Sequence, residues 1–196
     1  WLNDVGLAVI FQIMTDVFMT AIPILVWIFL MKQRIRDLGY RVGSRSRREG
    51  MAGLLLGFLS CSVIFIIVIT AGGGQVESWI PRFSPLTFVW LLIFVLVSVG
   101  EETLNRGFLM GTLRRTRSIA CIMLIPSVIF GCIHLANPNV TFFSIFNIVL
   151  AGLLLSYMYL KSGNLWMCMG FHFTWNAFQG LVYGMPVSGL NIPGIF

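Results

Sequence analysis

Residues Phe83 to Met110 read FSPLTFVWLLIFVLVSVGEETLNRGFLM, and this stretch decides the fold. The part up to Gly100 carries no charged side chain, and it is long enough for a helix to cross most of the hydrocarbon core of a bilayer. The same hydrophobic stretch then continues through Glu101, Glu102 and Arg106. The sequence therefore predicts a transmembrane helix that carries ionisable groups within its lipid-embedded region.

The rest of the chain has the same character. Of its 196 residues, 58% are apolar and only 10% are charged, and the mean hydropathy is +0.91. Soluble domains carry about 25% charged residues, so a soluble domain and a disordered chain are both excluded. Because backbone polar groups must be satisfied internally in lipid, we expect an all-α, polytopic transmembrane helical bundle. We predict one transmembrane domain over residues 1–196, a motif-bearing catalytic core at about 86–185, and about six spans: Val5 to Met31, Met51 to Ala71, Phe83 to Met110, Ser118 to Leu135, Thr141 to Leu160 and Asn164 to Tyr183.

The net charge of +6 comes mainly from basic residues between the predicted spans. Seven of the 13 lie between Lys32 and Arg48, and three more lie within residues 111–118. By the positive-inside rule, the basic loops 32–50 and 111–118 are cytoplasmic. No aromatic side chains interleave the basic run, so we expect contacts with anionic membrane lipids and no nucleic-acid partner. The short loops favour a bacterial plasma membrane.

Ionisable side chains inside a span cost at least about 2.5 to 3.5 kcal/mol each, which makes them functional-site candidates. Glu102 and Arg106 are four residues apart, so they can form an ion pair on one helical face. This pair leaves Glu101 without a counter-charge in its own helix, and Glu101 becomes the candidate reactive group. The alternative is that the whole segment is a structural polar clamp.

Both histidines of the chain also lie in predicted spans. His134 ends a hydrophobic helix, where it is either a catalytic group or a satisfied helix-end group. His172 and Asn176 are one helical turn apart and share a face, which Gln179 continues. This stripe is either part of a site or a set of hydrogen bonds between helices.

A carboxylate, two imidazoles and a carboxamide are the groups that amide hydrolysis requires. Glu101, withdrawn from bulk water, can act as a base toward a water molecule, and imidazoles can position that water. Glu101, His134 and His172 are also a ligand set that could hold a divalent metal such as zinc, and both mechanisms stay open. A carboxamide and an imidazole can stabilise the oxyanion. Covalent catalysis is disfavoured because no serine or cysteine has a neighbouring base.

The combined pattern resembles the CPBP intramembrane proteases, also called the Abi or CAAX-protease-like family. The resemblance covers about Gly100 to Phe178. Its motifs are Glu101-Glu102-x-x-x-Arg106-Gly107, Phe130-x-x-x-His134, Gly163-Asn-Leu-Trp166 and His172-x-x-x-Asn176.

The resemblance implies an all-helical membrane fold with a catalytic cavity inside the bilayer. It implies that Glu101 and His134 activate water, and that His172 and Asn176 contact the oxyanion. Members are commonly described as metalloproteases, although a metal-independent glutamate mechanism is also argued for the family. Asn105 departs from the aromatic residue that usually precedes the arginine, which puts substrate preference in doubt.

Two expectations concern the depth and surroundings of the site. The predicted spans place Glu101 near the cytoplasmic edge and His134 near the opposite edge, so helix tilt or a water-filled dip must bring them together. Asp16 also lies inside a span, and we expect it to pair across helices or to sit near a thinned interface rather than to line the cavity.

The leading interpretation is an intramembrane peptidase, a hydrolase acting on a membrane-associated peptide or a lipidated protein. One alternative is a non-catalytic membrane scaffold or bacteriocin-immunity protein that binds a partner, including a membrane-protein partner. Another is a small transporter that uses the acids as a proton relay.

Overall fold

The structure is a computed structural model that describes residues 2–76 and 80–195. Within these residues the chain is helical, and no strand forms beyond an isolated bridge between Val187 and Leu190. The α-helices are α1 (Leu2–Leu25), α2 (Ser44–Thr70), α3 (Pro85–Glu102), α4 (Met110–Leu113), α5 (Ile119–Ile133), α6 (Phe142–Ser162) and α7 (Trp166–Ala177). The π-helices are η1 (Val26–Leu30), η3 (Thr103–Leu109) and η6 (Phe178–Val182), and the 3₁₀ turns are η2 (Ile35–Leu38), η4 (Arg114–Thr116) and η5 (His134–Ala136).

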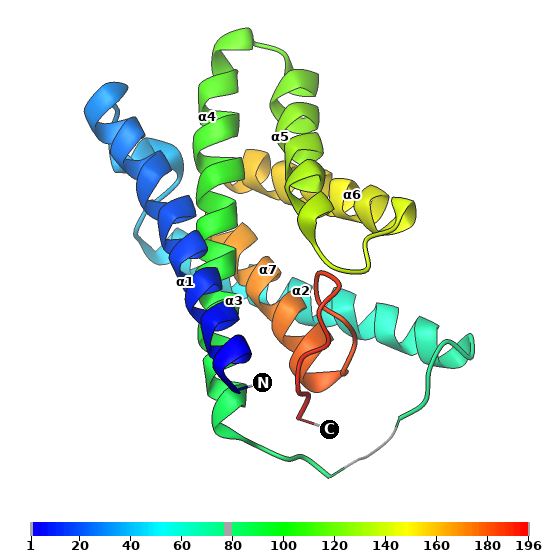
Figure 1. Cartoon of the computed structure of the whole chain (residues 1–196). Coiled ribbons are helices and arrows are strands. Elements are labelled where there is room, and N and C mark those ends of the chain that lie inside the picture. The colour runs from blue at the N-terminus through cyan, green and yellow to red at the C-terminus, as the bar shows by residue number, and fades with distance from the viewer. Residues whose placement is uncertain (1, 77–79, 196) are drawn as a thin grey trace.

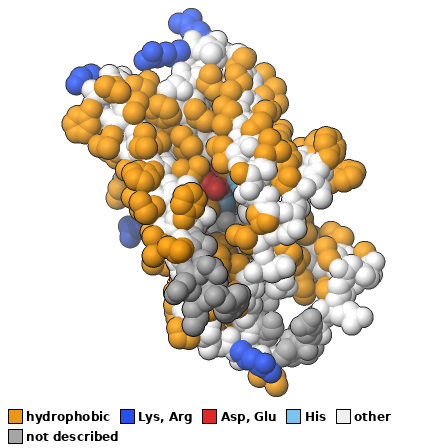
Figure 2. Space-filling view, in the orientation of Figure 1, with side chains coloured by type: hydrophobic (Ala, Val, Ile, Leu, Met, Phe, Trp, Pro, Cys, Tyr) orange, Lys and Arg blue, Asp and Glu red, His pale blue; other side chains and the backbone are white. Residues whose placement is uncertain are grey.

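Five helical stretches in the described residues are long and apolar enough to cross a membrane. They are Val9–Leu30, Ser44–Thr70, Pro85–Thr116, Ile119–Ala136 and Phe142–Ser162. The predicted sixth span is helical, but α7 and η6 together are shorter than these five. Figure 2 shows that hydrophobic side chains cover most of the visible face. The predicted all-α transmembrane bundle is therefore confirmed, with five full-length candidate spans instead of six, and the chain is an integral membrane protein.

The helices pack in pairs, α1 with α3, α5 with α6 and α2 with α7, and α3 joins α7 (Figure 1). The α2–α7 seam depends on glycine. A Cβ atom at Gly53 would lie 2.1 Å from the carbonyl oxygen of Met167, and one at Gly57 would lie 2.4 Å from that of Phe171. Only residues without a side chain allow two helix backbones to approach this closely in lipid. The seam thereby holds α7 against the bundle.

The third span is longer than predicted, and this corrects the expected depth mismatch. It is one helical rod from Pro85 to Thr116, and Glu101 lies 15 residues before its end. After the turn, α5 runs back beside the second half of the rod and reaches His134, which lies 16 residues after Ser118 (Figure 1). At about 1.5 Å per residue, the two side chains fall at a similar level near the middle of the rod. The chain after His134 therefore turns at mid-rod, rather than at the far end of the bundle.

The predicted basic loops are partly helical. Residues 44–50 form the first turns of α2, and residues 111–116 belong to the rod. Arginine favours helix, and Arg45 pairs with Glu49 one turn later, with Nε 2.9 Å from Oε1. Charged turns of this kind extend the apolar helices beyond their hydrophobic stretches.

Candidate active site

The buried ion pair at the start of the site confirms the predicted pairing of Glu102 with Arg106. Nη1 of Arg106 donates to Oε1 of Glu102 over 3.1 Å, and neither side chain is exposed. Nη2 donates to the carbonyl oxygen of Gly152 in α6 over 3.1 Å, and the guanidinium lies 4.6 Å from the centre of the Phe130 ring in α5. One fully buried cation therefore connects the rod to α5 and α6. These contacts occur at a π-helical segment, a feature that is frequent at functional sites.

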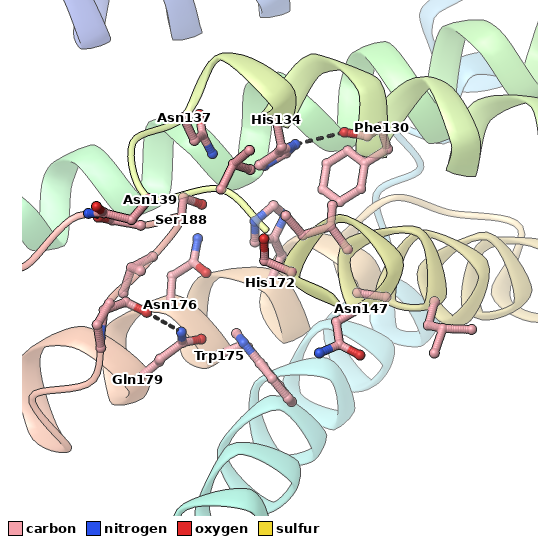
Figure 3. A pocket seen from close by; sticks show the side chains of 18 of the residues that line it. Phe130, His134, Asn137, Asn139, Asn147, His172, Trp175, Asn176, Gln179 and Ser188 are labelled. Atoms are coloured by element: carbon pink, nitrogen blue, oxygen red, sulfur yellow. Dashed lines mark hydrogen bonds between the residues drawn. The ribbon is translucent and has the colours of Figure 1, made fainter. Parts of the chain in front are cut away.

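His134 is placed by the helix that it ends. Its Nδ1 lies 2.7 Å from the carbonyl oxygen of Phe130. A carbonyl oxygen only accepts hydrogen bonds, so Nδ1 carries the proton in the neutral ring. Nε2 is then left with a free lone pair. Figure 3 shows the bond to Phe130 and His134 at the edge of the pocket.

His172 is oriented by Glu102, a contact that sequence reasoning missed. Its Nδ1 lies 2.9 Å from Oε1 of Glu102, the same oxygen that accepts from Arg106. A carboxylate paired with a guanidinium is ionised, so Nδ1 is the donor. Seventy positions separate the two residues, and no local spacing in the sequence indicates that they meet.

Glu101 differs from its neighbour in that its carboxylate accepts no hydrogen bond from the described residues, whereas Oε1 of Glu102 accepts two; Oε2 is buried without a donor in both acids. Oε2 of Glu101 lies 3.7 Å from Nε2 of His172. The side chain is 13% exposed. Asn105, four residues later, is fully buried and donates to the backbone oxygen of Glu101 over 2.9 Å. Glu101 therefore holds a carboxylate without a hydrogen-bond donor close to an imidazole, at the wall of the smaller cavity.

Two cavities share His134 and Asn176 in their linings. The larger has a volume of about 890 Å³, and its lining includes His134, His172 and Asn176. The smaller has a volume of about 470 Å³, and its lining includes Glu101, His134 and Asn176. Figure 3 shows Asn176 beside His172 in the larger cavity, and Figure 2 shows acidic and histidine atoms in a hollow of the hydrophobic surface. The four sequence-predicted residues thus line two cavities that share His134 and Asn176.

Asp16 lies in the smaller cavity, which corrects the expectation that it pairs across helices. It is 1% exposed, and its carboxylate accepts from Gln12 in the same helix. The cause is the close approach of α1 to α3: a Cβ atom at Gly100 would lie 2.8 Å from the backbone oxygen of Asp16. The signal in the sequence was an acid within an apolar span, but the approach of the two helices was not visible there.

The residues present do not fit a metal centre in this arrangement. Glu101 and His172 approach each other, but no three His, Cys, Asp or Glu side chains in residues 2–76 and 80–195 form a group that could hold a metal ion. His172 is oriented by Glu102 through Nδ1, and its Nε2 faces Glu101.

One protein family is similar to the part of the chain that carries the site. The family model described as "Type II CAAX prenyl endopeptidase Rce1-like" matches residues 83–178, a range that contains all four predicted catalytic residues. A relative from Bacillus subtilis (strain 168), "Uncharacterized protein YyaK", is 28% identical over 131 residues, which cover 59% of this chain and 42% of the relative. The chain thus spans less than half of that relative's length. No solved structure matches. Residues 83–178, which carry the site, are thus similar to the Rce1-like family of type II CAAX prenyl endopeptidases.

Proposed function

We propose that the protein is an intramembrane endopeptidase that hydrolyses a peptide bond of a membrane-associated peptide or a lipidated protein. The observation that carries this proposal is that the carboxylate of Glu101 accepts no hydrogen bond from the described residues, lies 3.7 Å from Nε2 of His172 and lines the smaller cavity together with His134 and Asn176. Buried polar atoms without partners are rare and need an explanation. A water molecule bound between Glu101 and the substrate supplies one.

In the proposed reaction, Glu101 removes a proton from this water as the water oxygen attacks the scissile carbonyl carbon. His134 assists because its free Nε2 can accept a hydrogen bond from the second O–H group of the water, which orients the water for attack. When the tetrahedral intermediate collapses, the carbon–nitrogen bond breaks, and the protonated Glu101 returns its proton to the leaving amine. The carboxylate is regenerated, so no covalent enzyme intermediate is needed.

The oxyanion requires hydrogen-bond donors, and Asn176 and His172 are the candidates. Asn176 is 8% exposed and lines both cavities. His172 already donates from Nδ1, so Nε2 donates only when the ring is protonated. Glu102 and Glu101, 2.9 and 3.7 Å away, supply the negative charge that such an imidazolium needs. A preorganised donor in a dry site contributes about 3 to 4 kcal/mol to transition-state stabilisation.

We also propose that the basic segments 32–50 and 111–118 face the cytoplasm of a bacterial cell and contact anionic lipid. Leu38 anchors the first segment, because its carbonyl oxygen accepts from the hydroxyl of the buried Tyr159 over 2.8 Å. The arginines around it remain exposed. An anchored cationic surface next to apolar helices suits a headgroup region.

The test is cleavage of quenched fluorescent membrane peptides by the purified chain in liposomes. Glu101→Gln and His172→Ala are each expected to lower kcat/KM by about 10² to 10⁴. Asp37→Asn is the matched control, because this acid lies on the exposed loop and pairs with Arg34. Parental rates in Glu101→Gln would refute the peptidase. Full complementation of a cellular phenotype by that variant would favour a binding scaffold, and ion-coupled flux would favour a transporter.

A further inference from the structure

The two cavities differ in charge. The described residues that line the larger one include no Asp, Glu, Lys or Arg, and its polar groups besides the two histidines are amides and hydroxyls, among them Asn137, Asn147 and Gln179. The smaller cavity is lined by two acids, Asp16 and Glu101, and by no Lys or Arg among the described residues. A substrate that occupies both cavities therefore meets a neutral environment on one side and an anionic environment on the other.

No Lys or Arg among the described residues compensates the two carboxylates in the smaller cavity. His172, 3.7 Å from Oε2 of Glu101, faces only this one of the two acids and carries a charge only when its ring is protonated. Asp16 accepts from the neutral amide of Gln12, whose Nε2 lies 3.1 and 3.2 Å from its two oxygens. Oε2 of Glu101 has no hydrogen-bond donor among the described residues, and Arg106 is occupied by Glu102 and Gly152. Removing carboxylates from water without a partner is costly. A cation that enters this cavity offsets that cost.

The remaining walls strengthen the attraction for a cation. Trp90 and Phe94 line the cavity, with ring centres 5.9 Å apart, and Met19 and Ile93 add apolar surface. An apolar wall lowers the local dielectric constant, and aromatic faces attract ammonium and guanidinium groups. This combination of acids and aromatic rings is suited to a positively charged organic group.

Asn176 independently indicates that a ligand spans the junction. It is 8% exposed and lines both cavities, and its side chain makes no hydrogen bond to another described residue. Figure 3 shows its carboxamide directed into the space beside His172. A buried carboxamide without a partner is satisfied when a peptide group binds at the junction.

We propose that the smaller cavity is a subsite for a cationic group of the substrate, a Lys or Arg side chain or a free N-terminal amine close to the scissile bond. Asp16 is the residue that selects this group, and the larger cavity takes an uncharged, apolar part of the same substrate. This inference rests on the proposed peptidase function and names its substrate class.

The experiment compares peptides that share one hydrophobic segment and differ at a single position near the cleaved bond, which holds Lys, norleucine or Glu. The parent protein is expected to prefer Lys to norleucine by about tenfold or more in kcat/KM, as for a hydrogen bond to a charged group. Asp16→Asn is expected to abolish this preference, and Asp16→Glu to keep it. Asp37→Asn, an acid remote from the cavities, should leave the preference intact.

Binding of the same peptides, followed by fluorescence anisotropy in nanodiscs, separates this inference from the proposed function. Charge-dependent binding that is lost in Asp16→Asn supports the subsite even if no peptide is cleaved, in which case only the peptidase is wrong. Equal binding of the Lys and norleucine peptides by the parent protein overturns the subsite. If a folded Asp16→Asn variant loses binding of the Lys and norleucine peptides equally, the subsite is also overturned. Asp16 would then act through Glu101, for example by sharing a proton with it.

Discussion

Glu101 and Glu102 are neighbours in the sequence, yet they belong to opposite sides of the site. Oε1 of Glu102 accepts from Arg106 and from His172, and the side chain is fully buried. Oε2 of Glu101 has no hydrogen-bond donor, and the carboxylate lines a cavity together with His134 and Asn176. The comparison shows how one helix can support a site and supply its reactive group: the acid that accepts two hydrogen bonds fixes geometry, and the acid that accepts none and lines the cavity is left for substrate and water.

Removing the buried ion pair of Glu102 with Arg106 is expected to have the largest effect on stability. Arg106→Leu leaves Glu102 buried without its guanidinium and removes the contacts with Gly152 and Phe130. Breaking a buried pair costs about 3 to 5 kcal/mol in the free energy of unfolding. Denaturant unfolding in detergent measures this loss, with the exposed Arg115→Leu as control. Equal stability of the two variants would contradict the assigned role of Arg106.

Glu102→Gln sharpens the contrast between the two acids, because it tests positioning rather than chemistry. The substitution keeps the size of the side chain but removes the charge that holds His172. We expect kcat/KM to fall by about 10- to 100-fold, as for other residues that orient a functional histidine. The pH profile of kcat/KM should also shift, because the charge facing His172 changes.

Glu101→Gln provides the other half of that comparison. Its carboxylate has no ion pair to Arg or Lys among the described residues, so this variant should lose activity and retain parental stability. An unchanged pH profile in Glu102→Gln, together with equal destabilisation of the two variants, would show that the acids do not differ in role.

The helix seam remote from the reactive groups gives a smaller and separable effect. Gly53→Ala places a methyl group 2.1 Å from the carbonyl oxygen of Met167, so α2 and α7 must move apart. Overpacking typically costs about 1 to 3 kcal/mol. Thermal unfolding should record the loss, while kcat at a temperature where the protein remains folded should change little. The neighbouring Gly50→Ala is the control, because its nearest contact would be an ordinary 3.5 Å.

The sequence predicted the parts of this structure that depend on local spacing. Four residues separate Glu102 from Arg106, and one helical turn separates His172 from Asn176, so their shared faces followed from helix geometry. The apolar runs predicted the five membrane-length helices found in the described residues. The resemblance to the family motifs predicted that Glu101 and His134 act on the same water molecule.

Contacts between distant segments were not predictable in the same way. The bond from His172 to Glu102 and the approach of Asp16 to Gly100 depend on how the helices pack. The position of His134 along the Pro85–Thr116 helix, close to that of Glu101, depends on arginine-containing turns that extend this helix to Thr116. Hydropathy assigned those turns to a loop. Hydropathy reports where lipid ends, whereas a helix ends where its backbone hydrogen bonds end.

The smallest expected effect is that of removing metal ions. Glu101 and His172 approach each other, but no third ligand completes a metal group among the described residues. We therefore expect a strong chelator to leave kcat/KM unchanged, since Glu101 alone can move the proton of water. A loss of activity that Zn²⁺ restores would contradict this expectation. It would mean that the side with Glu101 reorganises around a metal, and that the unsatisfied oxygen of Glu101 is a ligand rather than a base.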